Sequence, residues 1–231
     1  MMQDLSPTYF FDLQAYQHAS LFQSINYVWE ALTKIDAYLA SLTLGQIETT
    51  IPEGAFLIDR HLITIGKGTT IEPGAYIKGP CYIGSNCSIR HGAYIRGNVV
   101  TGNKCVIGHD TEIKQAILLD NAHAAHFAYV GDTILGNHVN LGAGTKCANL
   151  KLDNQQITLC GALGPVKTGL RKFGAILGDN TQIGCNTVTN PGTLMGKDVW
   201  CYPSINVGGM IPSHSVVKSE AKLIIKARTH Q

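Results

Sequence analysis

The sequence has few charged and few aromatic residues, and it contains no long hydrophobic run. Charged residues make up 15% of the 231 residues and aromatic residues 7%, and the formal net charge is only +2. A net charge this small gives no reason to expect nucleic acid or a membrane surface as a partner. No signal peptide, lipidation motif or membrane-spanning run is visible, so we expect a cytoplasmic protein with reduced cysteines.

What the sequence does have is a strict period of six residues. An aliphatic residue returns at every sixth position from Ile65 to Ile113, and Thr101 is the only interruption. Helices repeat near 3.6 residues and half-buried strands repeat at 2, so a period of six indicates short strands separated by regular turns. Hexapeptide repeats of this kind wind into a parallel β-helix. The sequence therefore predicts an all-β solenoid.

A second column of small residues supports this fold. It lies four residues after each aliphatic position, where a small side chain is needed if both columns point inward. In the first block it consists of Thr69, Ala75, Cys81, Cys87, Ala93, Val99, Cys105 and Thr111. We interpret its cysteines as small core residues and not as disulfide partners. The period resumes from Leu177 to Val207, so the solenoid is predicted for residues 51–212.

The N-terminal residues 1–50 lie outside the period. Apolar residues spaced by three and four predict a helix that starts near Ser24. We expect this segment to be a helical cap or arm. The role that we predict for it is to close an open end of the solenoid, because unpaired strand edges promote aggregation. Contacts between subunits are the alternative.

Two further segments depart from the period. Residues 150–174 are predicted to project as a loop, and loops on rigid scaffolds often carry function. Residues 213–231 form a C-terminal tail. Within it, the pattern of residues 216–227 does not decide between a strand and a short helix.

Three cations have the spacing of stacked coils. If three hexads make one triangular coil, residues 18 apart lie directly above one another, and Lys78, Arg96 and Lys114 have this spacing. Neighbouring coils lie about 4.8 Å apart. Like charges this close repel one another unless an anion neutralises them, so the ladder predicts a site for phosphate or carboxylate. The alternative is a row of solvated cations whose side chains splay apart.

Several histidines are candidates for a general base, because the unperturbed pKa of imidazole is about 6.5. They include His126, in a stretch where the period slips between Val130 and Leu135. The other candidates are His91, His109, His123 and His138. Taken singly, each is better explained as a turn or surface residue, and the pattern alone does not choose among them.

Four motifs between Gly108 and Asn149 carry a resemblance to a known family. GHDTEIK, HFAYVGD, NHVNLGAGT and CAN follow one another in this order. At these distances they resemble the C-terminal acetyltransferase domain of bifunctional sugar-1-phosphate nucleotidylyltransferases, which includes the enzymes that make UDP-N-acetylglucosamine and their archaeal relatives. The similarity covers roughly residues 65–211. It implies a left-handed β-helix, homotrimers with sites between neighbouring subunits, and acetyl-CoA as co-substrate without a metal.

The resemblance also implies a role for individual residues. The catalytic histidine of the family corresponds to His126, which would take a proton from the amino group of glucosamine 1-phosphate or galactosamine 1-phosphate during acetyl transfer. The phosphate-binding residues correspond to Arg96 and Lys114, which the 18-residue spacing also selects. The remaining matches are the sugar-binding Tyr129 and Asn140 and the residues near acetyl-CoA, Ala143 and Asn149.

Two departures from the family limit what is carried over. The sequence has no glycine-rich GxGTR loop, and its first 50 or so residues are too few for a nucleotide-binding fold, so we expect no pyrophosphorylase activity from this chain. In addition, Asp179 is assigned to the coenzyme site, at a position where the bacterial enzymes carry a serine. A carboxylate beside the pyrophosphate is unfavourable unless a cation such as Arg171 or Lys172 pairs with it.

The sequence thus predicts an acetyltransferase that acts on an amino-sugar 1-phosphate, and two alternatives remain. The first is a catalytically silent solenoid that still binds the sugar phosphate or a nucleotide sugar, which Asp179 favours. The second is a metal-dependent hydratase built on the same coil, which needs three histidines around one metal. His109 and His126 come near one-coil spacing, but no third histidine is placed with them.

Overall fold

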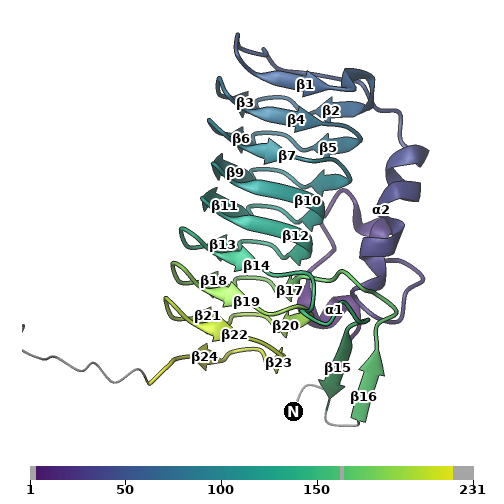
Figure 1. Cartoon of the computed structure of the whole chain (residues 1–231). Coiled ribbons are helices and arrows are strands. Elements are labelled where there is room, and N and C mark those ends of the chain that lie inside the picture. The colour runs from purple at the N-terminus through teal and green to yellow at the C-terminus, as the bar shows by residue number, and fades with distance from the viewer. Residues whose placement is uncertain (1–3, 162–163, 221–231) are drawn as a thin grey trace, which may run out of the picture.

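The chain forms a parallel β-solenoid with a helical segment along one flank, as the computed structural model in Figure 1 shows; it describes residues 4–161 and 164–220. Each coil has three walls, which we call faces 1, 2 and 3 in the order in which the chain passes from face 1 to face 2 to face 3. The strands of each face pair in parallel with those of the next coil. The predicted all-β solenoid is therefore confirmed.

The strands are short on every face. Face 1 consists of β1 (Phe56–Ile58), β4 (Tyr76–Lys78), β7 (Tyr94–Ile95), β10 (Glu112–Leu118), β12 (Tyr129–Leu135), β14 (Lys146–Cys147), β19 (Val188–Thr189) and β22 (Asn206–Val207). Face 2 consists of β2 (Ile63–Ile65), β5 (Cys81–Ile83), β8 (Val99–Thr101), the second halves of β10 and β12, β17 (Ala175–Leu177), β20 (Thr193–Met195) and β23 (Met210–Ile211). Face 3 consists of β3 (Thr70–Ile71), β6 (Ser88–Ile89), β9 (Val106–His109), β11 (His123–His126), β13 (Asn140–Leu141), β18 (Gln182–Ile183), β21 (Trp200–Cys201) and β24 (Val216–Val217).

The two inward columns predicted from the sequence fill the solenoid. All aliphatic residues of the first block are buried, as are the small residues between them. Thr101, the one interruption, is fully buried, and its hydroxyl accepts the Gly84 N–H at 3.0 Å and lies 3.1 Å from the Gly102 carbonyl. A threonine is accepted in the core because its hydroxyl is hydrogen-bonded there.

The coils are shorter by one residue where the site residues lie. Ile95 pairs with Ile113, a step of 18 residues, but Ile113 pairs with Val130 and Val130 with Cys147, each a step of 17. One slip falls at the predicted place between Val130 and Leu135, and a second, between Ile113 and Leu118, was missed. Each shortened turn has one residue in the left-handed region, Gln115 with φ 45° and Asp132 with φ 49°.

The next coil has an insertion at the same corner. Cys147 pairs with Thr189, a step of 42 residues, because residues 150–172 leave the solenoid there. They form an antiparallel hairpin of β15 (Thr158–Gly161) and β16 (Gly164–Lys167), which is visible at the lower edge in Figure 1. The structure thus contains the predicted projecting segment, which carries two strands of its own.

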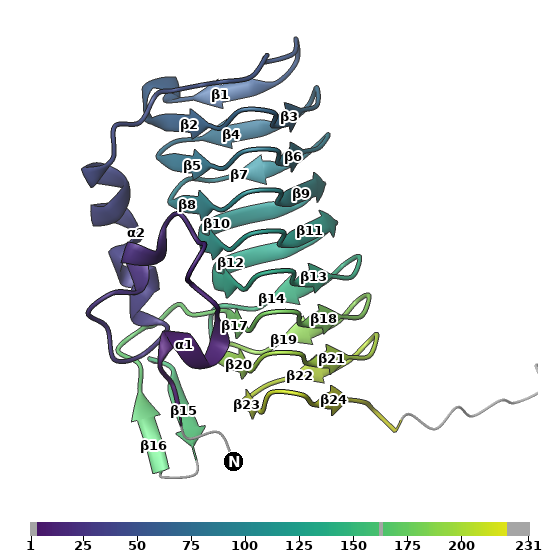
Figure 2. The same cartoon turned by 180° about the vertical axis from the view of Figure 1, so that it is seen from behind.

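The N-terminal segment covers a flank of the solenoid, and the prediction that it caps an end was wrong. It contains α1 (Pro7–Phe10), a 3-10 turn (Ala19–Phe22) and α2 (Glu30–Ser41), and both views in Figures 1 and 2 show it beside face 2. The helix begins at Glu30 and not near Ser24, which has φ 55°. A second 3-10 turn (Arg60–Leu62) lies within the first coil.

The flank position has a simple cause in the strands of face 2. From β8 onward their outward residues are apolar, so face 2 needs a cover there. These residues form one buried cluster with the N-terminal segment. The solenoid members of this cluster are Val100, Ile117, Leu119, Ile134, Ile176 and Leu194. Trp29 and Phe10 from the N-terminal segment are almost fully buried against them. Burial of apolar surface on this scale is the main stabilising contribution of the segment.

The C-terminal residues complete the last coil. Val216 and Val217 form β24, so the part of residues 216–227 that is described begins as a strand, while residues 221–227 lie outside the described residues. No helix of the described ranges is long and apolar enough to cross a membrane.

Candidate functional site

The cations predicted to stack do so at one corner of the solenoid. The register of β4, β7 and β10 places Lys78, Arg96 and Lys114 one above another at the turn from face 1 to face 2, which we call the cation corner. Two of the three are neutralised by the chain itself. The Arg96 guanidinium lies 2.6 Å from a Glu112 carboxylate oxygen, and the Lys114 ammonium lies 2.7 Å from Asp132 Oδ2.

The Lys114 pair belongs to a small network of hydrogen bonds. Asp132 Oδ2 also accepts a hydrogen bond from the Asn149 amide, Nδ2. The same Nδ2 lies 3.2 Å from the Tyr129 hydroxyl oxygen and donates to it. Three of the predicted site residues, Lys114, Tyr129 and Asn149, are therefore joined through one carboxylate that was not predicted.

The two ion pairs differ in their exposure to solvent. The side chains of Lys114 and Asp132 are 17% and 10% exposed, against 42% and 35% for Arg96 and Glu112. Solvent screens an exposed pair strongly and a buried pair weakly, so the electrostatic attraction is stronger in the Lys114 pair. Burial also raises the pKa of Tyr129, which keeps its phenol protonated near neutral pH.

His126 lies at the other end of face 1, at the turn from face 3 that we call the histidine corner. Its side chain is exposed, and its backbone carbonyl accepts the Gly144 N–H at 3.0 Å. His126 pairs in register with His109, and the rings of His109 and His91 stack at 5.7 Å. Tyr129 follows His126 by three residues, so the two side chains belong to the same level of the solenoid.

The stacked histidines do not form a metal centre in the described ranges. His91 Nδ1 lies 2.7 Å from the Pro73 carbonyl and His109 Nδ1 lies 3.1 Å from the His91 carbonyl. No group of three or more histidine, cysteine, aspartate or glutamate residues suited to a metal ion occurs among residues 4–161 and 164–220.

Asn140 and Ala143 lie on a different wall from the network. Asn140 is in β13 on face 3, between His123 and Gln182. Ala143 follows at the histidine corner, where its carbonyl accepts the Asn186 N–H at 2.8 Å. Apart from Asp179, the predicted residues therefore form two groups, one on face 1 and one on face 3. The two faces meet at the corner that carries His126.

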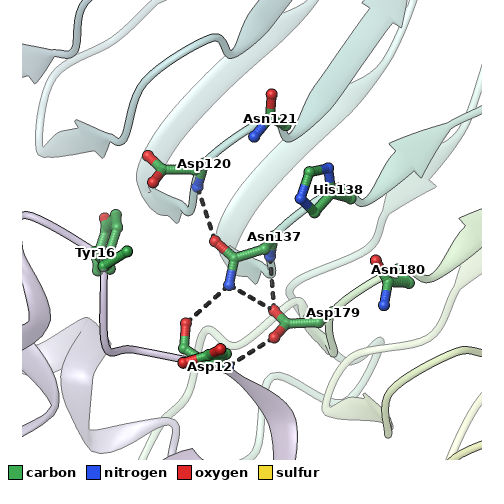
Figure 3. Close-up of a pocket in the computed structure, with 9 residues that line it drawn as sticks. Asp12, Tyr16, Asp120, Asn121, Asn137, His138, Asp179 and Asn180 are labelled. Carbon is green, nitrogen blue, oxygen red and sulfur yellow. Dashed lines mark hydrogen bonds between the residues drawn. The ribbon is translucent and has the colours of Figure 1, made fainter.

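Asp179 has a structural role that the sequence reading did not anticipate. It is 5% exposed and lies at the turn from face 2 to face 3, which we call the anchoring corner. Its Oδ1 accepts the Asn137 N–H at 2.7 Å and its Oδ2 accepts the Asp12 N–H at 2.6 Å, and its own N–H donates to the Phe10 carbonyl at 2.9 Å. Figure 3 shows the bonds of the Asp179 carboxylate to Asn137 and to Asp12 of the N-terminal segment.

The expected partners of Asp179 were therefore wrong. The nearest cation is Lys197, whose Nζ is 3.9 Å away, and neither Arg171 nor Lys172 is paired with this carboxylate in the described part of the chain. Both carboxylate oxygens are already occupied by the chain itself. Asp179 fastens the N-terminal segment to the solenoid, and burial raises the pKa of its carboxyl above the usual value.

A cavity of about 450 Å³ lies beside this anchor, between the N-terminal segment and the solenoid (Figure 3). It is lined by Asp12, Ala15, Tyr16, Asp120, Asn121, Asn137, His138, Asp179 and Asn180. Of the predicted site residues it contains only Asp179, and its carboxylates would repel a phosphate. The cavity is separate from the network at the cation corner.

Glu112 and Asp132 are the two site carboxylates that sequence reasoning missed. Asp132 is not reached by the 18-residue spacing, because the coil is shortened there and Lys114 pairs in register with Gly131, the residue before Asp132. Glu112 lies two residues before Lys114 on an outward position of the same strand. Both occur inside motifs that carried the family resemblance, DTEIK and YVGD.

Comparisons with known proteins place the similarity in the same region. Residues 77–170 match the family described as the GMPPB C-terminal domain. The bifunctional protein GlmU of Methanococcus aeolicus is 34% identical over 117 residues, which are 51% of this chain and 28% of that protein. The bifunctional sugar-1-phosphate nucleotidylyltransferase/acetyltransferase of Sulfurisphaera tokodaii is 33% identical over 92 residues, 40% of this chain and 23% of that protein.

The predicted resemblance is confirmed by these matches, although the matched part spans 28% or less of the length of these relatives. Among solved structures, the UDP-N-acetylglucosamine acyltransferase from Campylobacter jejuni superimposes with a TM-score of 0.51 at 16% identity, over 74% of this chain and 70% of that one. At this identity the likeness shows the fold, and it confirms the left-handed parallel β-helix.

Proposed function

We propose that the chain is an acetyl-CoA-dependent N-acetyltransferase that acts on an amino-sugar 1-phosphate in the pathway to UDP-N-acetylglucosamine. One observation carries the proposal. Face 1 brings Lys114, Tyr129 and Asn149 into one hydrogen-bonded network, with Arg96 one coil away and His126 at the end of the same wall. The relative from Sulfurisphaera tokodaii, which is named as a bifunctional sugar-1-phosphate nucleotidylyltransferase/acetyltransferase, supports the reaction class.

The chemistry of these groups fits acyl transfer by general-base catalysis. Arg96 and Lys114 would hold the phosphate oxygens through charge-assisted hydrogen bonds. His126 would take one proton from the amino group as its nitrogen attacks the thioester carbon, and the bond from that carbon to sulfur then breaks. The proton passes to the departing thiolate, so the products are the N-acetylated sugar phosphate and free coenzyme A. No metal is needed for these steps.

The division of the predicted residues between two faces supports a homotrimer. A ligand held by Lys114 and Tyr129 on face 1 lies on a different wall from Asn140 on face 3 of the same chain. A neighbouring copy whose face 3 lies against face 1 would bring both groups to one ligand. We propose that Asn140 and Ala143 of the neighbouring copy complete the sugar and acetyl-CoA contacts in this way, beside Asn149 on face 1. Sedimentation of a trimer is the expected result.

The proposal also includes the absence of pyrophosphorylase activity from this chain and a cytoplasmic location. The described residues form a solenoid, a flanking segment and a hairpin, without an α/β nucleotide fold, so we expect no consumption of UTP. A cytoplasmic location stays a prediction from the sequence, as an enzyme that uses acetyl-CoA requires access to that pool.

The test is release of free coenzyme A thiol from acetyl-CoA with glucosamine 1-phosphate, galactosamine 1-phosphate or no acceptor, with UTP followed in parallel. We expect release that depends on the acceptor, with no loss of UTP. Lys114→Ala should raise the KM for the sugar phosphate at least about 10-fold and leave the KM for acetyl-CoA nearly unchanged, because removing a charge-assisted bond costs about 1.5–3 kcal/mol.

The matched control is Lys151→Ala, which removes another ion-paired lysine, in the projecting segment. It should leave both KM values unchanged. Equal increases in both KM values for Lys114→Ala would contradict a phosphate role for Lys114.

A silent binding protein remains the second candidate, and one observation favours it. Arg96 and Lys114 are each paired with a carboxylate, so the corner is close to neutral before any phosphate arrives. A melting temperature that rises with glucosamine 1-phosphate, together with no thiol release from either sugar, would establish this second function.

A further inference from the structure

Asp132 is held in an unusual and well-defined position. It is the single left-handed residue of a shortened turn, with φ 49°, and it is 7% exposed. Its backbone carbonyl accepts the Gly174 N–H at 2.8 Å, which ties it to the far end of the inserted segment. Its side chain therefore has little freedom, and its Oδ2 receives both the Lys114 ammonium and the Asn149 amide.

An ionised carboxylate can only accept hydrogen bonds, and this determines how Asn149 is oriented. If the Asn149 amide were turned by 180°, its carbonyl oxygen would face the Asp132 oxygen without a hydrogen between them. The NH₂ group must therefore point toward Asp132, and Asn149 Oδ1 points elsewhere as an open acceptor.

The same constraint reaches Tyr129. Asn149 Nδ2 donates to the Tyr129 oxygen at 3.2 Å, so the phenol accepts this bond and its own hydrogen remains available. Since burial raises the pKa of Tyr129, the phenol keeps that hydrogen at neutral pH. The network thus shows three groups to a ligand: the Lys114 cation, the Tyr129 O–H donor and the Asn149 carbonyl acceptor.

We propose that Asp132 is a positioning residue that sets the pattern of donors and acceptors in this site, and so selects a ligand with anionic oxygens on one side and an N–H donor on the other. This inference rests on the proposed function, because it names the chemistry that the same site recognises. Glu112 has no such role. Its pair with Arg96 is the more exposed one and its carboxylate orients no third side chain among the described residues.

The test uses an exchange of two side chains. Asp132→Asn keeps the size of the residue and its tolerance of the left-handed turn, but an amide does not force Asn149 into one orientation. The double variant with Asn149→Asp again places an amide against a carboxylate. The carboxylate is now at position 149, however, so the Tyr129 hydroxyl must donate its hydrogen to it and can no longer donate to a ligand. Both variants should bind glucosamine 1-phosphate at least about 10-fold more weakly by titration calorimetry, as expected for loss of about 1.4 kcal/mol or more.

Melting temperatures show whether Asp132 orients the binding groups or only stabilises the turn. The exchanged variant should recover most of the thermal stability lost in Asp132→Asn without recovering the affinity. Recovery of both together would overturn the proposal, because Asp132 would then only hold the turn. Tyr129→Phe, which leaves Asp132 and its partners in place, should lose the same affinity, and unchanged binding by this variant would also overturn it. Asp153→Asn, an exposed ion-pair carboxylate, is the control for the loss of one charge.

The binding readout keeps this inference distinct from the proposed reaction. If the natural protein binds glucosamine 1-phosphate but releases no thiol, the acetyltransferase proposal fails while weaker binding by the variants still upholds the role of Asp132. If the natural protein and the folded variants bind equally, the role of Asp132 fails while thiol release still upholds the acetyltransferase. Absence of binding by the natural protein overturns both.

Discussion

The cation corner and the anchoring corner each contain one buried aspartate, and the two have different kinds of partner. Asp132 accepts from the side chains of Lys114 and Asn149, whereas Asp179 accepts from the backbone N–H groups of Asn137 and Asp12 and from the Asn137 side-chain amide. Their exposed fractions are similar, 7% and 5%. Burial alone therefore does not distinguish a site residue from a structural one.

The difference lies in what the donors can still do. A backbone N–H has one hydrogen, which Asp179 uses fully. The Asn137 amide gives its two hydrogens to Asp179 and to the Asp12 carbonyl, so none of these donors is left for a ligand. The Lys114 ammonium has three hydrogens and the Asn149 amide also has an acceptor oxygen, so both can bind Asp132 and a ligand together. Two buried carboxylates in one solenoid thus serve recognition in one case and attachment in the other.

The largest effect on activity is expected at face 1, the wall that carries Asp132. His126→Ala should lower the rate of acetyl transfer about 10² to 10⁴-fold, which is the usual contribution of a general base. Its melting temperature should stay close to that of the natural protein, because the side chain is exposed. His109→Ala, one coil away at the same corner, is the control and should keep the rate. Early unfolding of His126→Ala with an intact rate per folded molecule would contradict the assignment.

At the anchoring corner we expect a loss of stability while the activity of the folded protein is kept. Asp179→Ala leaves the N–H groups of Asn137 and Asp12 without their acceptor, so the free energy of unfolding should fall by about 2–4 kcal/mol. Amide hydrogen exchange should increase in residues 9–17, and the folded variant should keep its kcat and its KM for acetyl-CoA.

Asp198→Ala is the control for the anchoring corner, because its carboxylate is exposed and pairs with His214. It should leave the stability nearly unchanged. A rise of about 10-fold or more in the acetyl-CoA KM of folded Asp179→Ala would instead place Asp179 in the coenzyme site, as the sequence reading had it.

The smallest effect is the dependence of stability on pH, which we expect from a buried histidine of the N-terminal segment. Burial lowers the pKa of His18 to about 4, and its Nδ1 lies 2.7 Å from the Tyr38 hydroxyl. The unfolded chain takes up a proton near pH 6.5 and the folded chain does so only near pH 4, so stability is lost as the pH falls between these values. Between pH 7 and pH 5 the loss from His18 should be about 2 kcal/mol.

The Asp179 carboxyl has the opposite effect on the pH dependence of stability. Because its pKa is raised, the folded chain protonates this carboxyl before the unfolded chain does as the pH falls, which favours the folded state at lower pH. The measurement is therefore denaturant unfolding of the natural protein and of His18→Phe at both pH values. The variant should show a loss smaller by about 2 kcal/mol. Equal losses in the two proteins would contradict the role of His18.

The fold was predictable because its signal is repeated and local. Each coil places an aliphatic residue and a small one at the same positions, so the same inward pattern recurs several times within residues 65–113. The cation stack followed from the same arithmetic. The second slip, between Ile113 and Leu118, was missed because a single shortened repeat next to an intact one leaves only one unmatched position.

The arrangement of the N-terminal segment was not predictable in this way. Its apolar residues showed that it would be buried, but not where, because a contact such as that of Asp12 with Asp179 occurs once and has no period. The signal for the flank was present in the strands of face 2, where Val100, Ile117 and Ile134 put an apolar residue on the outward position. A solenoid wall with apolar residues on both sides requires a cover.

The attachment of the first residues to the last coils also determines the order in which this protein can be completed on the ribosome. The Tyr9 hydroxyl accepts the N–H of Ser213, and the Phe10 carbonyl accepts that of Asp179. At a synthesis rate of about 5–20 residues per second, roughly 10–40 s pass between the emergence of Tyr9 and that of Ser213. The coils can close one by one during this time, since each needs only its neighbour. The contacts of the N-terminal segment with Asp179 and Ser213 can therefore form only after most of the coils have been made.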